Sequence, residues 1–496
     1  MKKIILLYLS IVFITGCNNT QPKTNAANKN EPRFSVEQLQ EDFKVFRTSL
    51  QEIHPGLYSF VSKDSMDYYF NNTFATLNHP MTKDEFFRLL TPIIRMTYDE
   101  HTSLDFSYKY DSLKKFLPVK IRWVNNIPYI YKNLLKNPTV ILGSEIISIN
   151  GRNSKEIFKE IKSVYRNGTT DETLEYDVYS LHFDYLYASF IEQPDSFSID
   201  AINPVTKEKY IIRSPALLIT DTIHCIRIPQ MAEDYCKKDT CYRFNIDKEN
   251  GFAKMTISGL NTYEMEASKI DFHKQLDDDF KRISAEKISN LIIYLRYCFG
   301  GSPRYGAKLV SHLYNKSFRI FDTISSAITK VPTYSKYTNW SQDDWIKEVP
   351  LLKELKSNSI TKNDWSTLRD TLILPNKQQF RGNIYVLINS DIHSAASITS
   401  ALLDYHTNAT FIGTPISGPY NSGNAIDFVL LTLPNTKIVV DIPLLHYSLA
   451  VPDNLYANKK GIAPDILIHQ KINDILNNKD LILDSTITLI RTTNYR

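Results

Sequence analysis

Glycine is scarce in this sequence, and several common ligand-binding signatures are absent from it. The chain has 15 glycines among 496 residues, and Gly300-Gly301 is its only pair of adjacent glycines. It contains no H-E-x-x-H, Walker A or G-x-G-x-x-G motif, the usual signatures of zinc peptidases, P-loop proteins and dinucleotide-binding folds. The net charge is only +4, and Lys and Arg do not form a basic stripe, so the sequence has no pattern typical of nucleic-acid binding. These absences predict a protein with no cofactor, no metal and no nucleic-acid partner.

Cysteine is also rare, with five in the whole chain. Cys236 and Cys241 flank KKDT and can close a small surface disulfide in an oxidising compartment, a pairing that the sequence leaves open. A single C-x4-C without a second pair of ligands is a poor zinc site. Cys298 has no basic residue directly beside it to activate its thiol, so we expect a small buried residue rather than a nucleophile.

The first seventeen residues form a short apolar segment between a basic start and a cysteine. MKK precedes the apolar run Ile4–Ile14, and ITGC ends at Cys17. The run is too short for a transmembrane helix. It resembles a bacterial lipoprotein signal, in which residues 1–16 are removed and Cys17 is lipidated; a plain cleaved signal peptide is the alternative. The polar residues 17–33 are typical of a disordered tether. We therefore expect a lipid-anchored protein of the bacterial cell envelope, on the outer membrane or the periplasmic face.

Residues 34–104 have the pattern of a small helical domain. Capping boxes begin at Ser35 and Thr82, and each opens a segment whose apolar residues recur at spacings of three and four. The second segment runs into YDEHTSL, where the helical pattern stops. The domain is therefore predicted to end by presenting His101 on an exit loop.

In the remainder of the chain, the spacing of the apolar residues changes from one segment to the next. Residues 105–215 alternate as strands do, with turns at Asn-Asn and Asn-Gly, and predict a strand-rich module. Residues 216–250 are expected to be an irregular connector. In 251–496 strands and helices alternate, which predicts an α/β domain, with a polar insertion at about 314–375.

Ser394 stands at a predicted strand-to-helix turn. GNIYVLI before it has the composition of a buried strand, and the apolar residues after it recur at helical spacing. Such a turn can present a side chain and a backbone N–H at the mouth of a sheet. Serine is also a preferred helix N-cap, so by itself Ser394 fits either a cap or a nucleophile. Gly300-Gly301 follows another buried strand, where glycine lets backbone N–H groups approach a ligand; a plain tight turn is the alternative.

Five motifs extend this interpretation to a family. NLIIYLRYCFGGSP, SDIHSAASITSALLDY, ATFIGTPISG and KKGIAPDI occur in the order and rough spacing of the C-terminal processing (tail-specific) serine proteases. YDEHTSL after a helical domain resembles the tricorn-core and retinoid-binding-protein-like branch. The resemblance covers most of residues 34–470. It implies an α/β catalytic layer of the ClpP/crotonase-like kind, a PDZ-like module at 105–215, and a peptide or protein substrate.

The resemblance also assigns roles. It places the nucleophile on Ser394 and the oxyanion donors on the Gly300/Gly301 loop and the N–H of Ala395. One branch uses a lysine base, but this chain has Ser-Gly-Pro419 at that position. The other branch uses a histidine, which falls on His101, and a serine hydroxyl needs such a base.

Several assignments stay open. His393 and His446 are rival bases. Candidates for the third catalytic group are Asp404, Glu100 and Asp465, because Asn458 stands where the family has a glutamate. The loop before Gly301 departs from the family pattern, and Ser397 replaces a common acid.

The sequence thus predicts a lipid-anchored serine endopeptidase acting through Ser394 and His101. The alternative is a catalytically inactive relative that binds peptides or protein C-termini, and a third hypothesis is an unrelated nutrient-binding lipoprotein. The sequence does not indicate the cleavage-site preference or the physiological substrate.

Overall fold

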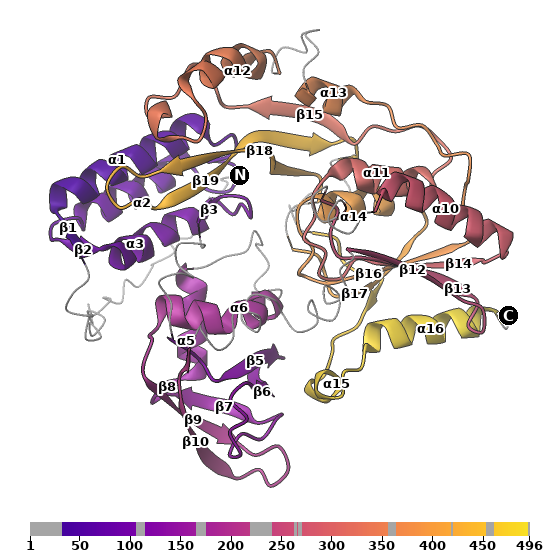
Figure 1. Cartoon of the computed structure of the whole chain (residues 1–496), viewed down its shortest axis with the longest axis horizontal. Helices are drawn as coiled ribbons and strands as arrows, with labels where there is room; N and C mark the ends of the chain where they lie inside the picture. Colours follow the sequence, from indigo (N-terminus) through magenta and orange to yellow (C-terminus); the bar gives the residue numbers. More distant parts are fainter. Residues whose placement is uncertain are drawn as a thin grey trace, which may run out of the picture.

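The computed structural model describes residues 32–105, 115–164, 175–218, 241–261, 265, 270–355, 364–417, 420–452 and 461–494. Figure 1 shows a group of N-terminal helices, a strand-rich module after it, and a larger sheet with helices on both faces. Some residues discussed above lie outside the described residues: Cys17, Cys236, Pro419 and Asn458. Within the described residues no helix is long and apolar enough to cross a membrane.

The N-terminal group contains the helices that the capping boxes predict. They are α1 (Val36–Ile53), α2 (Lys63–Ala75) and α3 (Lys83–Arg95). Both capping boxes are formed, at the N-termini of α1 and α3. The helices bury a cluster of aromatic rings that includes Phe43, Phe46 and Phe70. Strand β1 (Arg33–Phe34) pairs with β2 (Met81–Thr82), and α3 leads towards β3 (Ser103–Leu104).

The middle module is an antiparallel sheet covered by two helices. Its strand order is β10-β9-β7-β6-β5, with β8 paired to β7, and β11 pairs with β4 outside this sheet. The strands are β4 (Lys115–Phe116), β5 (Val119–Val124), β6 (Ile127–Asn133), β7 (Glu145–Ile149), β8 (Arg152–Asn153), β9 (Ser196–Ile202), β10 (Lys209–Pro215) and β11 (Leu217–Leu218). The helices are α5 (Ser154–Val164) and α6 (Glu175–Phe190). Asn125 and Asn126 turn between β5 and β6 with positive φ, as expected for a tight hairpin.

The larger sheet has the order β12-β13-β14-β16-β17-β20, parallel except at β12. Its strands are β12 (Tyr242–Asp247), β13 (Phe252–Ile257), β14 (Asn290–Tyr294), β16 (Asn383–Ile388), β17 (Thr410–Gly413) and β20 (Ile466–Leu467). Residues 242–247 were expected in an irregular connector. They form the edge strand β12 instead, because Tyr242 and alternate apolar residues after it pack against the sheet.

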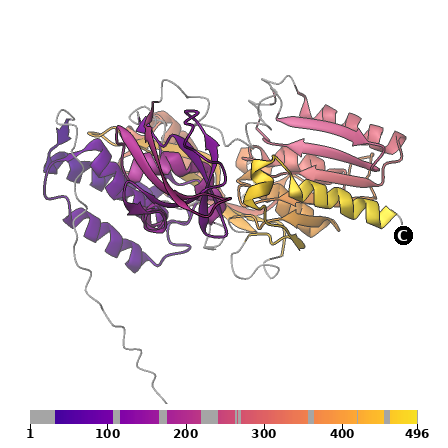
Figure 2. The same ribbon diagram turned by 90° about the horizontal axis from the view of Figure 1, so that it is seen from below.

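Helices cover both faces of this sheet. On one face lie α10 (Phe272–Ala285), α11 (Pro303–Ser311) and α14 (Ala395–His406), and on the other α15 (Ile472–Leu476) and α16 (Leu481–Asn494). In Figure 2, α16 lies in front of the strands. Successive residues of β14 alternate between the two layers: Ile293 packs with the main core, and Ile292 packs with Ile482 and Ile490 of α16. The predicted α/β architecture is present, because buried parallel strands need apolar residues on both faces.

A third sheet connects the two ends of the molecule. It contains β15 (Phe321–Ser326), β19 (Val439–Leu449) and β18 (Ser422–Thr432), with β3 paired to β19. The expected insertion also forms η2 (Ser335–Tyr337), α12 (Gln342–Glu354) and α13 (Asp364–Asp370). The β18–β19 hairpin reaches α1, where buried Asp42 accepts hydrogen bonds from the backbone N–H groups of Asn435 and Thr436, each at 2.8 Å. The hairpin thereby links the N-terminal helices to the larger sheet.

Candidate active site

Ser394 lies in a strained turn between β16 and α14. Its φ is 54° and its ψ is −127°, a conformation that is unfavourable for a residue with a Cβ. Ser394 occupies the N-cap position, but its side chain makes no capping hydrogen bond. The interpretation of this serine as an ordinary cap is therefore wrong. Strain of this kind persists only where the surroundings hold it, and it is concentrated at functional sites.

The Gly300/Gly301 loop lies directly against this turn. Gly300 has a φ of 89°, and a Cβ there would stand 2.7 Å from the Cβ of Ser394 and 2.8 Å from the nitrogen of Ala395. Gly301 has a φ of 136° and forms a β-bridge with Leu260, whose backbone leaves no room for a Cβ. Ala395 is the first residue of α14, so helical bonding leaves its N–H unused. Backbone donors beside a serine can stabilise an oxyanion.

His101 lies on the exit loop after α3, where the carboxylate of Glu100 lies between its ring and the backbone of Ser394. The Nε2 atom of His101 lies 3.8 Å from Oε1 of Glu100, and the same oxygen accepts a 2.9 Å hydrogen bond from the backbone N–H of Ser394. The ring of His101 contacts Phe428 of β18, with 5.6 Å between centroids. In the described part of the chain, no hydrogen bond joins His101 to Ser394 itself. The ring of His101 and the backbone of Ser394 thus share Glu100 as a common neighbour.

His393 is tied to two carboxylates. Its Nδ1 lies 2.8 Å from Oε2 of Glu100 and its Nε2 lies 3.0 Å from Oδ1 of Asp391. Burial disfavours the charged form, but the hydrogen bonds that the ring donates to Asp391 and Glu100 and the charges of these carboxylates raise the pKa of His393 to about 10. Burial likewise opposes ionisation of Glu100, yet the bond from His393 and the nearby imidazoles lower the pKa of Glu100 to about 2. A protonated His393 with both nitrogens engaged cannot accept a proton from Ser394 at neutral pH.

The other candidates make hydrogen bonds to other partners. Nδ1 of His446 lies 2.9 Å from Oδ1 of Asn424. Asp404 accepts a hydrogen bond from the hydroxyl of Tyr420, and Asp465 accepts one from the N–H of Phe411. Of the three carboxylates proposed as the third group, only Glu100 contacts His101.

Asp99 is a neighbour of His101 that sequence reasoning missed. Its Oδ1 accepts the backbone N–H of His101 at 3.1 Å and lies 3.8 Å from Nδ1 of the ring. Burial disfavours its charge, but hydrogen bonds from His54 and Thr102 hold the pKa of Asp99 below its usual value. An aspartate two residues before a histidine in a non-helical turn is a recognisable local signal, because aspartate commonly accepts the N–H two residues on.

A small cavity of about 30 Å³ opens beside these groups. Its walls come from loops of the N-terminal group, from α14, from the segment after β17 and from the β18–β19 hairpin. They consist of Phe60, Tyr98, Asp99, Glu100, His101, Ser397, Ser417, Gly423, Asn424 and Tyr447. The hydroxyl of Ser417 is buried there with no hydrogen-bond partner among the described residues. No single domain of the chain could form this cavity alone.

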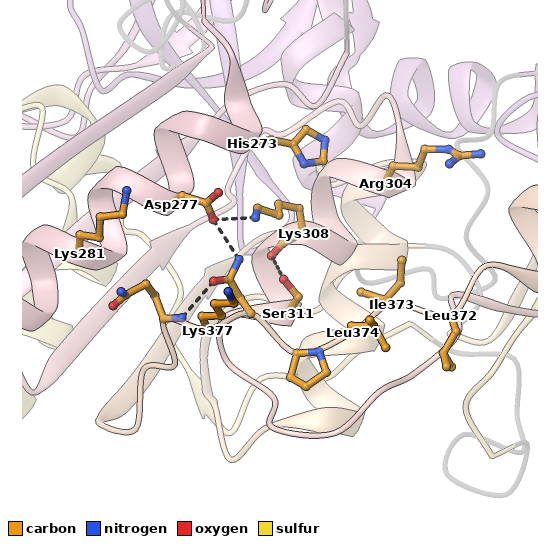
Figure 3. Close-up of a pocket in the computed structure, with 13 residues that line it drawn as sticks. His273, Asp277, Lys281, Arg304, Lys308, Ser311, Leu372, Ile373, Leu374 and Lys377 are labelled. Atoms are coloured by element: carbon orange, nitrogen blue, oxygen red, sulfur yellow. Dashed lines mark hydrogen bonds and ion pairs between the residues drawn. The ribbon is translucent and has the colours of Figure 1, made fainter.

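A larger hollow, of about 770 Å³, lies elsewhere, between α10, α11 and residues 372–378 (Figure 3). Asp277 binds Lys308 at 2.6 Å and Asn376 at 2.9 Å across it, and Leu372 and Leu374 remain exposed. None of the predicted site residues lines this hollow. Among the described residues, no group of three or more His, Cys, Asp or Glu could hold a metal ion.

Comparison with known proteins indicates the class of protein to which this fold belongs. Residues 250–468 match the model of peptidase family S41. Mature CPAF has a similar fold, with a TM-score of 0.62 and 14% identity over 92% of this chain and 97% of that one. A structure of mature CPAF complexed with lactacystin gives a TM-score of 0.62 and 13% identity, over 92% and 98%. No curated protein sequence matches the chain.

The fold and the family match define a serine-type peptidase. More specifically, residues 250–468 carry the peptidase domain of family S41.

Proposed function

We propose that this protein is a lipid-anchored serine endopeptidase that cleaves peptide bonds through an acyl-enzyme on Ser394, with His101 as general base. The observation that carries the proposal is the strained, uncapped Ser394 packed against Gly300 and sharing Glu100 with His101. A serine whose hydroxyl caps nothing, at the first turn of a helix beside a glycine loop, is available for nucleophilic attack.

The proposed reaction uses these groups in sequence. Nε2 of His101 takes the proton of Ser394 as Oγ attacks the carbonyl carbon, and the N–H of Ala395 and the Gly300/Gly301 loop bind the oxyanion. His101 then gives the proton to the leaving amine, and water hydrolyses the ester after activation by the same imidazole. For the first step Nε2 has to come within hydrogen-bond reach of Oγ, a contact that commonly tightens only when substrate binds.

Substitution of Ser394 tests the proposal. Ser394→Ala should abolish peptide hydrolysis and labelling by a fluorophosphonate probe, while the free energy of unfolding changes by less than about 1 kcal/mol. Ser400→Ala is the matched control, because its hydroxyl binds the carbonyl of Ala396 further along the same helix, and it should keep both properties. Turnover by Ser394→Ala would rule out the mechanism.

The second candidate is a catalytically inactive relative that binds peptides or protein C-termini. It is favoured by the position of Glu100, whose carboxylate faces His101 Nε2 where the serine hydroxyl would be needed. This function predicts no labelling of the wild type and a peptide affinity that Ser394→Ala leaves unchanged.

We also propose the finer fold assignments. The parallel strands β13, β14, β16 and β17, with Ser394 following β16, support a ClpP/crotonase-like layer. The antiparallel sheet from β5 to β10 with α5 and α6 supports a PDZ-like module that receives the peptide. A lipid on Cys17 would place the peptidase on the bacterial cell envelope.

A further inference from the structure

We propose that Asp99 orients His101 for proton transfer and that His54 in turn positions Asp99. The inference rests on the proposed function, because it assigns neighbours to the general base of that reaction. It concerns residues of the N-terminal helical group, far in sequence from Ser394.

The two nitrogens of His101 face different carboxylates. Nε2 faces Glu100, on the side of Ser394, and Nδ1 lies 3.8 Å from Oδ1 of Asp99. A general base must leave free the nitrogen that faces the serine, while its other nitrogen carries a proton directed at an acceptor. Glu100 cannot be that acceptor, because it faces Nε2 and already accepts hydrogen bonds from His393 and from the N–H of Ser394. Asp99 faces Nδ1, the nitrogen that has to carry the proton.

Asp99 is held rigidly. Its side chain is 3% exposed. Oδ1 accepts the backbone N–H of His101, which fixes the carboxylate relative to the chain that carries the ring. Oδ2 accepts the hydroxyl of Thr102 at 2.6 Å and lies 3.2 Å from Nε2 of His54. A buried, ionised carboxylate in this position stabilises a proton on Nδ1 and the imidazolium that forms during catalysis.

The protonation of His54 follows from its own contacts. Its Nδ1 accepts the backbone N–H of Gly56 at 3.0 Å, so this nitrogen carries no proton. The proton of a neutral His54 is therefore on Nε2, which lies 2.7 Å from the hydroxyl oxygen of Thr102. Because the Thr102 hydroxyl donates to Asp99, the hydrogen bonds run in one direction, from Gly56 through His54 and Thr102 to Asp99. His54 is the C-cap of α1, and its backbone N–H donates to the carbonyl of Leu50, so the end of the helix holds this histidine in place.

Asp99→Asn tests the assignment. This change keeps the shape of the side chain but removes its charge and allows an N–H to face Nδ1. We expect kcat to fall by about 100-fold or more with KM changed less than about threefold. Asp441→Asn is the matched control, since Asp441 is a nearby carboxylate that accepts the hydroxyl of Ser103, and it should keep kcat.

Two substitutions of His54 separate positioning from packing. His54→Gln can still present an N–H near the place of Nε2, so it should retain most of the wild-type kcat. His54→Leu fills similar space without the donor, so its kcat should fall at least about tenfold below that of His54→Gln, at unchanged KM. Equal kcat values for the two variants would contradict the role of His54.

The failure of this inference differs from failure of the proposed function. Asp99→Asn with full kcat, alongside inactive Ser394→Ala and His101→Ala, would overturn the role of Asp99 and leave the peptidase mechanism intact. A large loss of kcat in Glu100→Gln with none in Asp99→Asn would move the role to Glu100. An active Ser394→Ala would instead overturn the mechanism.

If Asp99→Asn does not fold, Thr102→Val is the alternative test. It removes one hydrogen-bond donor from Oδ2 of Asp99 and should lower kcat by itself. An unchanged kcat in Thr102→Val would overturn the assignment.

Discussion

The charges of Glu100 and His393 join the N-terminal helical group to the turn that carries Ser394. Glu100 comes from the loop after α3, and its two oxygens bind the backbone of Ser394 and the imidazole of His393. Asp391 holds the other nitrogen of that imidazole. The contact therefore does two things: it keeps the serine in its positive-φ conformation, and it keeps His393 from acting as a base.

The stability of the protein should depend on pH through this pair. The pKa of His393 is raised from 6.5 to about 10, so its contribution is complete below pH 6.5 and is lost as the pH rises through 10. The pKa of Glu100 is lowered from 4.5 to about 2, so its contribution is present above pH 4.5 and is lost as the pH falls towards 2. The pair therefore stabilises the fold fully between pH 4.5 and 6.5.

Glu100→Gln should lower the free energy of unfolding by about 2 kcal/mol near pH 6. It should also make the decline of the free energy of unfolding between pH 6.5 and 10 smaller. Part of the decline should remain, because Asp391 still raises the pKa of His393. Urea unfolding of both proteins at pH 6, 8 and 9.5 measures this. Identical pH dependence in the two proteins would contradict the pairing.

At the scale of elements, the contact between the glycine loop and the N-terminus of α14 decides whether an oxyanion can be bound. Gly300→Ala places a methyl group within 3 Å of His393, Ser394 and Ala395, so the loop or the turn has to move. We expect kcat to fall on the order of 100-fold. Gly151→Ala is the control, because Gly151 also has a positive φ but a methyl group there would meet nothing within 4 Å. A Gly300→Ala enzyme with wild-type kcat would exclude this loop from the oxyanion site.

The β18–β19 hairpin is attached to α1 by a buried carboxylate. Asp42 accepts the N–H groups of Asn435 and Thr436 and the hydroxyl of Thr436. Asp42→Ala leaves these donors unsatisfied, which should lower the free energy of unfolding by about 3 kcal/mol. Asp64→Ala, in the first turn of α2, is an exposed acidic control. Equal urea midpoints for the two variants would show that the hairpin does not depend on Asp42.

At the scale of the whole molecule, the proposed anchor determines where the peptidase works. Cys17→Ser should move the protein from the membrane fraction to the soluble fraction and abolish incorporation of labelled palmitate. The activity of the released protein on a soluble peptide should be unchanged, because the tether is outside the catalytic residues. A wild type that incorporates no palmitate would remove the lipoprotein proposal and leave the peptidase proposal standing.

The sequence by itself determined the local elements. The capping boxes at Ser35 and Thr82, the strand before Ser394 and the turn at Asn125 were all predictable, because each depends on a few neighbouring residues and on the period of the apolar ones. The same local reasoning missed β12, since whether residues 242–247 pair with a sheet depends on an edge supplied by distant residues. It also identified Ser394, Gly300 and His101 as candidates, with the help of a family resemblance.

Only the tertiary structure decided how these candidates meet. Residue types and spacing cannot say which carboxylate faces which nitrogen of a histidine, because that depends on packing between residues almost 300 positions apart, as for Glu100 and Ser394. The same packing brings Glu100 to His393 and raises the pKa of that histidine to about 10, whereas Asp99 is a local neighbour of His101 that sequence reasoning passed over. Burial and direction of hydrogen bonds are properties of the folded chain, and they determine the chemistry that each of these side chains can perform.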